Sequence, residues 1–342
     1  MAEGLLPVII VTGFLGSGKT TLLRYWLGHP DFLRTVVIVN EYGTVGLDQR
    51  VLRQVEENTI LLGGGCACCN VRSDLVRELK NIINARDTGE LEVDRVVIET
   101  SGLADPAPIL FSIMTDSVLR HHYKVQCVVS CLDSVNGKLH LTSGGESVKQ
   151  IVVADRVILT KADMAKTEEM QELRDMVRAI NPASVVLESS FGEIEPDVVF
   201  AADTVRRSEA EVHRIAGMRP FHTAMVRSIS IGFREPLNWA AFGIWLSALL
   251  YAHGESIYRV KGILDTGEAG PVLLNGVQHI IYPPQHLDDW GEEEHRSELV
   301  FIMRDIDPHT ILESLRAFQH LIGARAEIRE IDITPTNERN IK

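Results

Sequence analysis

The sequence predicts a doubly wound, mostly parallel α/β sheet, followed by a smaller two-layer α+β domain. Three observations lead to this fold class. Up to about residue 190, short β-branched runs alternate with helical patterns, which is typical of a parallel sheet covered by helices on both faces. The first of these runs leads directly into a glycine-rich loop and a helix. Beyond about residue 220, strand patterns follow one another more closely, which indicates a second, smaller domain.

The strands of the first domain are the short apolar runs that end at polar or glycine-containing segments. The candidates are Val8–Val11, Val36–Val39, Thr59–Leu62, Arg95–Ile98, Val125–Ser130, Val157–Leu159 and Ser184–Leu187. Helical patterns fall between most of them, for example at Leu22–Trp26, Ser73–Ala85 and Thr167–Ile180. Ligands of such sheets bind at the carboxyl ends of the strands, so the candidate site residues are sought there.

Domain boundaries follow from the loss of periodicity after the last of these strands. We predict a first domain over residues 1–190, a connection over 191–220 and a second domain over 221–332. The expected elements of the second domain are strands Met225–Ile231, Ile257–Leu264, Gln278–Tyr282 and Leu299–Ile302, a short strand around Val272, and helices Leu237–Ala252 and His309–Phe318. The acidic segment Asp288–Glu298 is expected to be an exposed loop.

Composition and charge exclude several classes of protein. The 342 residues include 34 Lys and Arg against 47 Asp and Glu, a net charge of −13, which argues against a nucleic-acid partner. The longest apolar stretch, Leu237–Tyr251, is too short to cross a bilayer comfortably, and Met1–Pro7 lacks a secretory signal. Three of the five cysteines lie within four residues and cannot form a disulfide framework. We therefore expect a cytoplasmic protein without a membrane partner.

A phosphate-binding loop follows the first strand. The sequence G-F-L-G-S-G-K-T matches G-x-x-x-x-G-K-[ST] at every fixed position. Backbone N–H groups of such a loop converge on phosphate oxygens, and the next helix directs its positive N-terminus at the same anion. Lys19 is expected to reach the β- and γ-phosphates, and the Thr20 hydroxyl to bind Mg²⁺. A chance glycine-rich turn is the alternative. The predicted phosphate-binding residues are Gly13, Gly16, Ser17, Gly18, Lys19, Thr20 and Thr21.

Two acidic residues stand at the ends of later strands. Glu41 comes directly after the second strand, where it could join the Mg²⁺ sphere or sense the γ-phosphate; an exposed loop acid is an equally good interpretation. Glu99 ends the strand Arg95–Ile98, which suits an Mg²⁺-linked or water-positioning role, and Gly102 permits a close approach of its loop to the γ-phosphate. The alternative for Glu99 is a helix cap.

A guanine-binding element is indicated by T-K-A-D after the strand Val157–Leu159. In GTPases, an [N/T]-K-x-D element follows a strand of the sheet. Asp163 would accept hydrogen bonds from guanine N1–H and the exocyclic amine, and the stem of Lys161 would pack over the ring. Adenine lacks that amine. The element also lies downstream of the phosphate-binding loop and of the strand that ends at Glu99, in the order found in GTPases. Thr160, Lys161 and Asp163 therefore indicate GTP as the nucleotide.

A thiol-rich segment, G-G-G-C-A-C-C, follows the third strand. The thiols of Cys66, Cys68 and Cys69 can converge on one soft or borderline cation such as Zn²⁺, Co²⁺ or Cu⁺. A redox pair or buried structural cysteines are the alternatives. Cys127 and Cys131 lie on or beside a predicted strand and are expected in the core.

Taken in this order, the motifs resemble those of the CobW-type GTPases (CobW/HypB/UreG-like, with a CobW C-terminal domain). The resemblance covers nearly the whole chain. Its carriers are GFLGSGKTTLL, NEYGTVGLD, GGGCACCNVRSDL, ETSGLADPAPI and ADRVILTKAD in the first domain, and RVKGIL, NGVQHI and ELVFI in the second. The family hallmark GCxCC falls on Gly65, Cys66, Cys68 and Cys69. Thr160 replaces the usual Asn of NKxD, which should leave the selectivity of Asp163 intact and weaken nucleotide affinity.

The resemblance implies a GTP-hydrolysing metallochaperone that uses GTP and Mg²⁺ and delivers Zn²⁺ or Co²⁺ to a client metalloprotein or metal-inserting enzyme. Lys19, Glu41 and Glu99 would carry catalysis and couple the γ-phosphate to the thiol segment, and the second domain would recognise the client. A homodimer that depends on nucleotide or metal is a further expectation. Two alternatives stay open: a GTP-switched binding module with structural or redox cysteines, and an ATP-dependent kinase in which Asp163 is idle.

Overall fold

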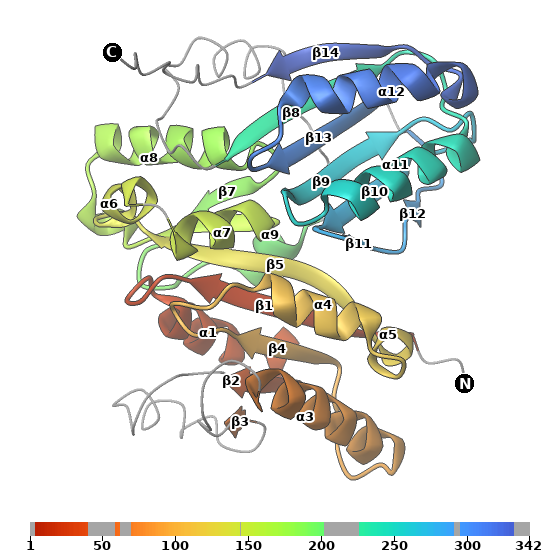
Figure 1. Ribbon diagram of the computed structural model, residues 1–342. Helices are drawn as coiled ribbons and strands as arrows, with labels where there is room; N and C mark the ends of the chain where they lie inside the picture. The colour runs from red at the N-terminus through yellow and green to blue at the C-terminus, as the bar shows by residue number, and fades with distance from the viewer. Residues whose placement is uncertain are drawn as a thin grey trace. The chain divides into compact units, whose positions relative to one another are not determined.

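A computed structural model describes residues 4–39, 59–61, 70–143, 145–201, 226–290 and 295–331. The chain divides into two compact units, one of Met1–Arg174 with Ser184–Asp203 and the other of Asp175–Ala183 with Thr204–Lys342. The first holds a parallel sheet between helices and the second an antiparallel sheet, so the predicted fold class is confirmed (Figure 1). The exact domain boundaries at residues 190 and 220 stay a prediction.

In the described part of the first unit, seven strands form one sheet. They are β1 (Leu6–Gly13), β2 (Thr35–Val39), β3 (Thr59–Leu61), β4 (Arg95–Glu99), β5 (Tyr123–Asp133), β6 (Arg156–Thr160) and β7 (Val185–Glu188). Their order is β3-β2-β4-β1-β5-β6-β7, and every pairing is parallel. Every predicted strand of this unit is present. Strands β2, β3 and β4 lie on one side of β1, and β5, β6 and β7 lie on the other. The loop after β1 therefore lies at the point where the strand order reverses, and such sheets bind ligands there.

Helices cover this sheet between the strands. They are α1 (Lys19–Leu27), α3 (Asn70–Asp87), α4 (Ala107–Thr115), α5 (Leu119–His122), α6 (Gly137–Thr142), α7 (Glu146–Val153), α8 (Thr167–Ile180) and α9 (Pro196–Phe200), with 3₁₀ turns η1 (Pro30–Phe32) and η3 (Ala162–Met164). The prediction for α8 has the observed bounds. Val8, Ile9, Ile10 and Val11 of β1 are all fully buried, because helices cover both faces of a parallel sheet.

The start of the predicted connection contains a short helix. In α9, Val199 is fully buried, and the ring of Phe200 lies 5.2 Å from that of Trp26 in α1. The Nε1 atom of Trp26 also donates a hydrogen bond to the carbonyl oxygen of Ile194 at 3.0 Å. Residues of this segment therefore pack into the core of the first unit.

The second unit is a two-layer α+β structure, as predicted. Its described strands are β8 (Arg227–Phe233), β9 (Ile257–Leu264), β10 (Val272–Val277), β11 (Ile280–Ile281), β12 (Gln285–His286), β13 (Ser297–Met303) and β14 (Ala326–Ile331). They form an antiparallel sheet in the order β11-β10-β9-β13-β8-β14, and β12 also pairs with β10.

Two helices, α11 (Trp239–His253) and α12 (Pro308–Ile322), share a buried apolar cluster with this sheet. The Asn238 side chain caps α11 by accepting the N–H of Ala241 at 3.0 Å. Three details differ from the sequence prediction. Strands β12 and β14 were not anticipated, and Glu298 lies in β13 rather than in the predicted acidic loop.

Candidate nucleotide-binding site

The glycine-rich loop connects the end of β1 to the start of α1, as its motif predicts. Gly13 has φ +138°, and a Cβ there would collide with the carbonyl oxygen of Cys131 in the neighbouring strand β5. Gly16 and Gly18 have φ of +71° and +86°. Only glycine fits the first of these positions without displacing a strand, and α1 begins directly after the loop at Lys19.

The loop gathers polar groups that suit an anion. Lys19 is 8% exposed, and its ammonium donates hydrogen bonds to the carbonyl oxygens of Gly13 at 2.9 Å and Phe14 at 3.2 Å. The buried Oγ of Ser17 has no hydrogen-bond partner among the described residues, and it lies next to Gly13. A buried hydroxyl without a partner near a buried ammonium fits a phosphate group, because phosphate oxygens accept from both.

The two predicted Mg²⁺ ligands of the protein are in contact. Thr20 Oγ1, in the first turn of α1, donates to Glu99 Oε1 at 3.0 Å. Glu99 ends β4 and is 6% exposed. Glu99 does not cap a helix, because the next helix, α4, begins only at Ala107. The N–H of Ala107 donates to the side chain of Asp105. A hydroxyl beside a buried carboxylate offers the oxygen ligands that Mg²⁺ prefers.

Gly102 lies against the phosphate-binding loop. A Cβ on this residue would lie 2.6 Å from the backbone nitrogen of Leu15. Its carbonyl oxygen accepts a hydrogen bond from Gln150 Nε2 at 3.2 Å, and the same amide donates to Ala104 at 3.1 Å. Gln150 is 1% exposed and fixes this loop. The sequence analysis did not single it out, because a glutamine within α7 carries no motif.

The T-K-A-D element is tied to the same loop. Thr160 Oγ1 donates to the carbonyl oxygen of Ser17 at 2.8 Å, so the residue that departs from the usual Asn supports the phosphate-binding loop. Lys161 adopts a left-handed conformation with φ +56°, and its Nζ donates to Asp133 Oδ2 at 2.7 Å. Asp163 lies exposed in η3. The T-K-A-D element and the glycine-rich loop thus adjoin one another.

Asp133 is a candidate site residue that the sequence analysis missed. It ends β5, is 3% exposed, and accepts hydrogen bonds from Lys161, from Asn136 and from the N–H of Val135. Burial by itself would raise the pKa of this carboxyl group. The hydrogen bonds from Lys161, Asn136 and Val135 outweigh burial and hold its pKa below the usual value. The predicted strand ends at Ser130, so the signal used for Glu99, an acid at the carboxyl end of a strand, points to Asp133 only when the strand is extended to its observed end.

The remaining predicted site residues, Glu41, Cys66, Cys68 and Cys69, lie outside the described residues. Within the described ranges, no group of three or more His, Cys, Asp or Glu side chains is arranged to hold a metal ion. Cys127 and Cys131 are buried in the core, as expected, and burial raises the pKa of the Cys131 thiol to about 12.

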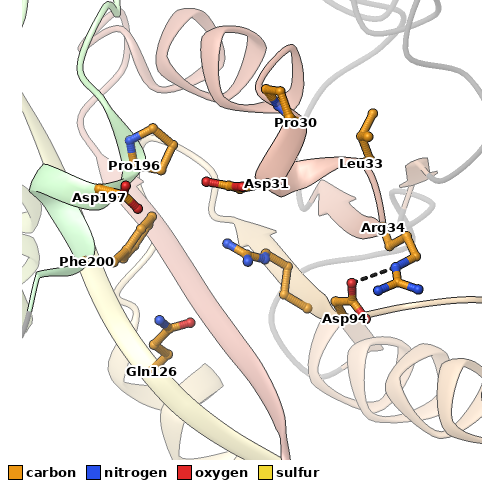
Figure 2. A pocket seen from close by; sticks show the side chains of 10 residues that line it. Pro30, Asp31, Leu33, Arg34, Asp94, Gln126, Pro196, Asp197 and Phe200 are labelled. Carbon is orange, nitrogen blue, oxygen red and sulfur yellow. Dashed lines mark hydrogen bonds and ion pairs between the residues drawn. The ribbon is translucent and has the colours of Figure 1, made fainter.

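A cavity of about 590 Å³ opens near the amino ends of β2 and β4. Figure 2 shows its lining, which includes Arg34 and Asp94, joined by an ion pair of 2.6 Å, together with Gln126, Asp197 and Phe200. Arg34 and Asp94 directly precede β2 and β4, at the amino ends of these strands. The phosphate-binding loop and Glu99 lie instead at the carboxyl ends of β1 and β4. The cavity is therefore separate from the candidate nucleotide site.

Comparison with known proteins identifies the family. Residues 7–188 match the CobW/HypB/UreG nucleotide-binding domain. The chain belongs to the CobW/HypB/UreG family. Residues 226–319 of this family member match the cobalamin synthesis protein cobW C-terminal domain. The zinc chaperone YjiA of Escherichia coli (strain K12) is 30% identical over 304 residues, covering 87% of this chain and 93% of that protein. The zinc chaperone CobW of Pseudomonas aeruginosa is 31% identical over 353 residues, covering 91% of each chain.

A fission-yeast relative and two crystal structures add to this comparison. The zinc-regulated GTPase metalloprotein activator 1 of Schizosaccharomyces pombe is 27% identical over 350 residues, 90% of this chain and 81% of that protein. The crystal structure of Zn(II)-bound E. coli YjiA GTPase has a TM-score of 0.67 at 25% identity, covering 92% of this chain and 99% of that chain. A Zn(II)-bound YjiA variant with one glutamate and two cysteines replaced by alanine has a TM-score of 0.68 at the same identity and coverage.

These findings identify this CobW/HypB/UreG member as a P-loop GTPase. Among the described residues, no helix has the length and apolar character needed to cross a membrane.

Proposed function

We propose that this GTPase is a zinc chaperone. GTP binding assembles a metal site at Cys66, Cys68 and Cys69, and hydrolysis releases the ion to a client metalloprotein. The names of the relatives that span most of the chain support zinc as the cargo. A C-x-C-C site also suits Co²⁺, so cobalt remains the second candidate for the ion.

The observation that carries this proposal is the strand order β3-β2-β4-β1. The thiol segment follows β3, Glu41 follows β2, Glu99 ends β4, and the phosphate-binding loop follows β1. The four strands are parallel and adjacent, so their carboxyl ends lie side by side at the same end of the sheet. A change at the γ-phosphate therefore has a short route to the thiols, and ordering of loops by γ-phosphate and Mg²⁺ is an established way of switching.

In the proposed nucleotide site, each group has a separate task. Gly13, Gly16, Ser17, Gly18, Lys19, Thr20, Thr21 and Gly102 would bind or adjoin the phosphates, and Thr160, Lys161 and Asp163 would hold guanine. Thr20 and Glu99 would hold Mg²⁺, which neutralises charge on the β- and γ-phosphates when bound. Lys19 stabilises the negative charge that grows on the phosphate oxygens during transfer. Glu41 and Glu99 would relay the state of the γ-phosphate to the neighbouring loops.

The proposed metal site leaves one position for a further ligand. Three thiolates fill three of the four tetrahedral positions that zinc prefers, and a water, Glu41 or a client group would supply the fourth. An incomplete protein shell favours release, because a client can attack through the open position. Such thiols must remain reduced, so we also propose a cytoplasmic location.

The test is a Co²⁺ titration of the whole protein, followed by thiolate charge-transfer absorption under reducing conditions. We expect tighter binding with Mg²⁺ and a non-hydrolysable GTP analogue than with Mg²⁺-GDP. Linkage requires the metal to tighten the GTP analogue by the same factor. Equal Co²⁺ affinity in both nucleotide states would rule out the chaperone cycle.

Cysteine variants locate the metal site. The absorption should disappear in Cys68→Ala and persist in Cys127→Ala, whose thiol lies in the core. Total zinc content is a poor readout, because the YjiA variant that lacks a glutamate and two cysteines is still Zn(II)-bound. A normal GTPase rate with no thiolate absorption would favour the GTP-switched binding module instead. Chromatography in each nucleotide and metal state would test the proposed homodimer.

A further inference from the structure

The segment after β7 adjoins the guanine element. The Ser189 N–H donates to the carbonyl oxygen of Leu159 at 2.9 Å, and the Ala162 N–H donates to the carbonyl oxygen of Ser189 at 3.2 Å. Ala162 stands between the two predicted guanine contacts, Lys161 and Asp163. The segment that follows Ser189 is therefore fixed beside the T-K-A-D turn.

The same segment touches the helix that follows the phosphate-binding loop. A Cβ on Gly192 would lie 2.8 Å from the carbonyl oxygen of Thr21, in the first turn of α1. A tight turn spans Ser190 to Glu193, because the Glu193 N–H donates a hydrogen bond to the carbonyl oxygen of Ser190 at 2.9 Å. Phe191 occupies the turn between the guanine element on one side and α1 on the other.

Phe191 has two properties that its local packing does not explain. Its side chain is 72% exposed, although exposure of an apolar ring to water is unfavourable. Its φ is +56°, a left-handed conformation that bulky residues rarely adopt and that tends to occur at functional sites. The anchors at Ser189 and Gly192 hold the backbone in this conformation and present the ring to solvent.

We propose that Phe191 stacks on the purine base of the bound nucleotide and forms the wall of the base site opposite the Lys161 stem. This inference rests on the proposed GTP site. The Lys161 stem is held in place by its 2.7 Å bond to Asp133, so one face of the base has a fixed support and Phe191 supplies the other. An aromatic ring stacks on any base, whereas Asp163 reads the edge of guanine. Phe191 therefore sets affinity for purine nucleotides, and Asp163 sets the preference for guanine.

The test measures the affinities of the whole protein for GDP and IDP by displacement of a fluorescent GDP analogue. Hypoxanthine lacks the exocyclic amine and keeps the stacking face. Phe191→Asn removes the ring and retains a residue that tolerates positive φ, so the turn is preserved. We expect both affinities to fall about tenfold or more, because base stacking on an aromatic ring typically contributes that much. The ratio of the two affinities should stay unchanged.

Two further variants separate stacking from a structural role. Phe191→Trp should keep wild-type affinity, and GDP should quench the emission of the new indole. The matched control is Phe111→Ala, which removes a partly exposed phenylalanine from α4 and should leave both affinities intact.

The outcomes distinguish this inference from the proposed function. Wild-type GDP affinity in Phe191→Asn, or unquenched emission in Phe191→Trp at saturating GDP, would overturn the stacking role while leaving the GTP site in place. A change in the GDP to IDP ratio would overturn the division of roles between Phe191 and Asp163. Absence of guanine nucleotide binding by the unmodified protein would instead refute the nucleotide site itself.

Discussion

Replacing Asp133 by asparagine removes one buried charge from the link between the guanine element and β5. Asp133 is 3% exposed, and its Oδ2 accepts from Lys161 Nζ at 2.7 Å and from Asn136 Nδ2 at 3.0 Å. Its Oδ1 accepts the N–H of Val135 at 2.8 Å. The asparagine amide has one oxygen in place of two, so its NH₂ group must face one of these donors.

The size of the effect follows from the bonds that are lost. A hydrogen bond to a charged group contributes about 1.5–3 kcal/mol, and a buried donor left without a partner costs about 1–3 kcal/mol. We therefore expect Asp133→Asn to lower the free energy of unfolding by about 3 kcal/mol. Because Lys161 loses its anchor, GDP affinity should also fall.

Urea denaturation of the nucleotide-free protein, followed by circular dichroism, measures the loss of stability. The matched control is Asp94→Asn, which makes the same chemical change in an ion pair with Arg34 whose two side chains are 56% and 50% exposed. Exposed pairs contribute roughly 0.2–1 kcal/mol. If both variants lose the same free energy of unfolding, the reasoning about burial is wrong.

The pH dependence of stability provides a second readout for Asp133. Its pKa is lowered in the folded protein, so its contribution is fully present above the pKa of an unfolded aspartate, about 4. That contribution is lost as the pH falls through the lower pKa of the folded state. The stability gap between wild type and Asp133→Asn should therefore be widest near neutral pH and narrow below about pH 4. A gap that is constant across this range would contradict the assignment.

Three further predictions concern the nucleotide site. Lys19→Ala should reduce GTP hydrolysis at least about 100-fold by removing a cation from the phosphate site, measured as phosphate release, whereas Lys138→Ala, at an exposed lysine, should retain the wild-type rate. Gly102→Ala should weaken nucleotide binding and lower the melting temperature, because its Cβ would lie 2.6 Å from the loop backbone; Gly243→Ala, with no atom within 4 Å, should do neither. Asp163→Asn should shift the measured preference from GTP toward XTP, and unchanged preference would show that Asp163 does not read the base.

Local sequence determined much of this protein. The β-branched runs predicted every strand of the parallel sheet, because such side chains fill a sheet buried on both faces. The spacing of the glycine-rich loop predicted its position between β1 and α1. Glu99 was found because it ends a recognisable strand, and Thr160 because the T-K-A-D pattern follows one. The signals in these cases lie within a few neighbouring residues, where backbone preferences and burial act directly.

Tertiary structure decided which of these groups meet. Strand β14 has no clear apolar run, and it becomes a strand only because β8, far away in the sequence, offers an edge to pair with. The anchoring of Lys161 by Asp133 depends on the parallel pairing of β5 with β6. The bond from Thr160 to Ser17 joins residues separated by 143 positions. Strand order sets these contacts, and strand order depends on how whole elements pack together, which the spacing of residues along one segment does not specify.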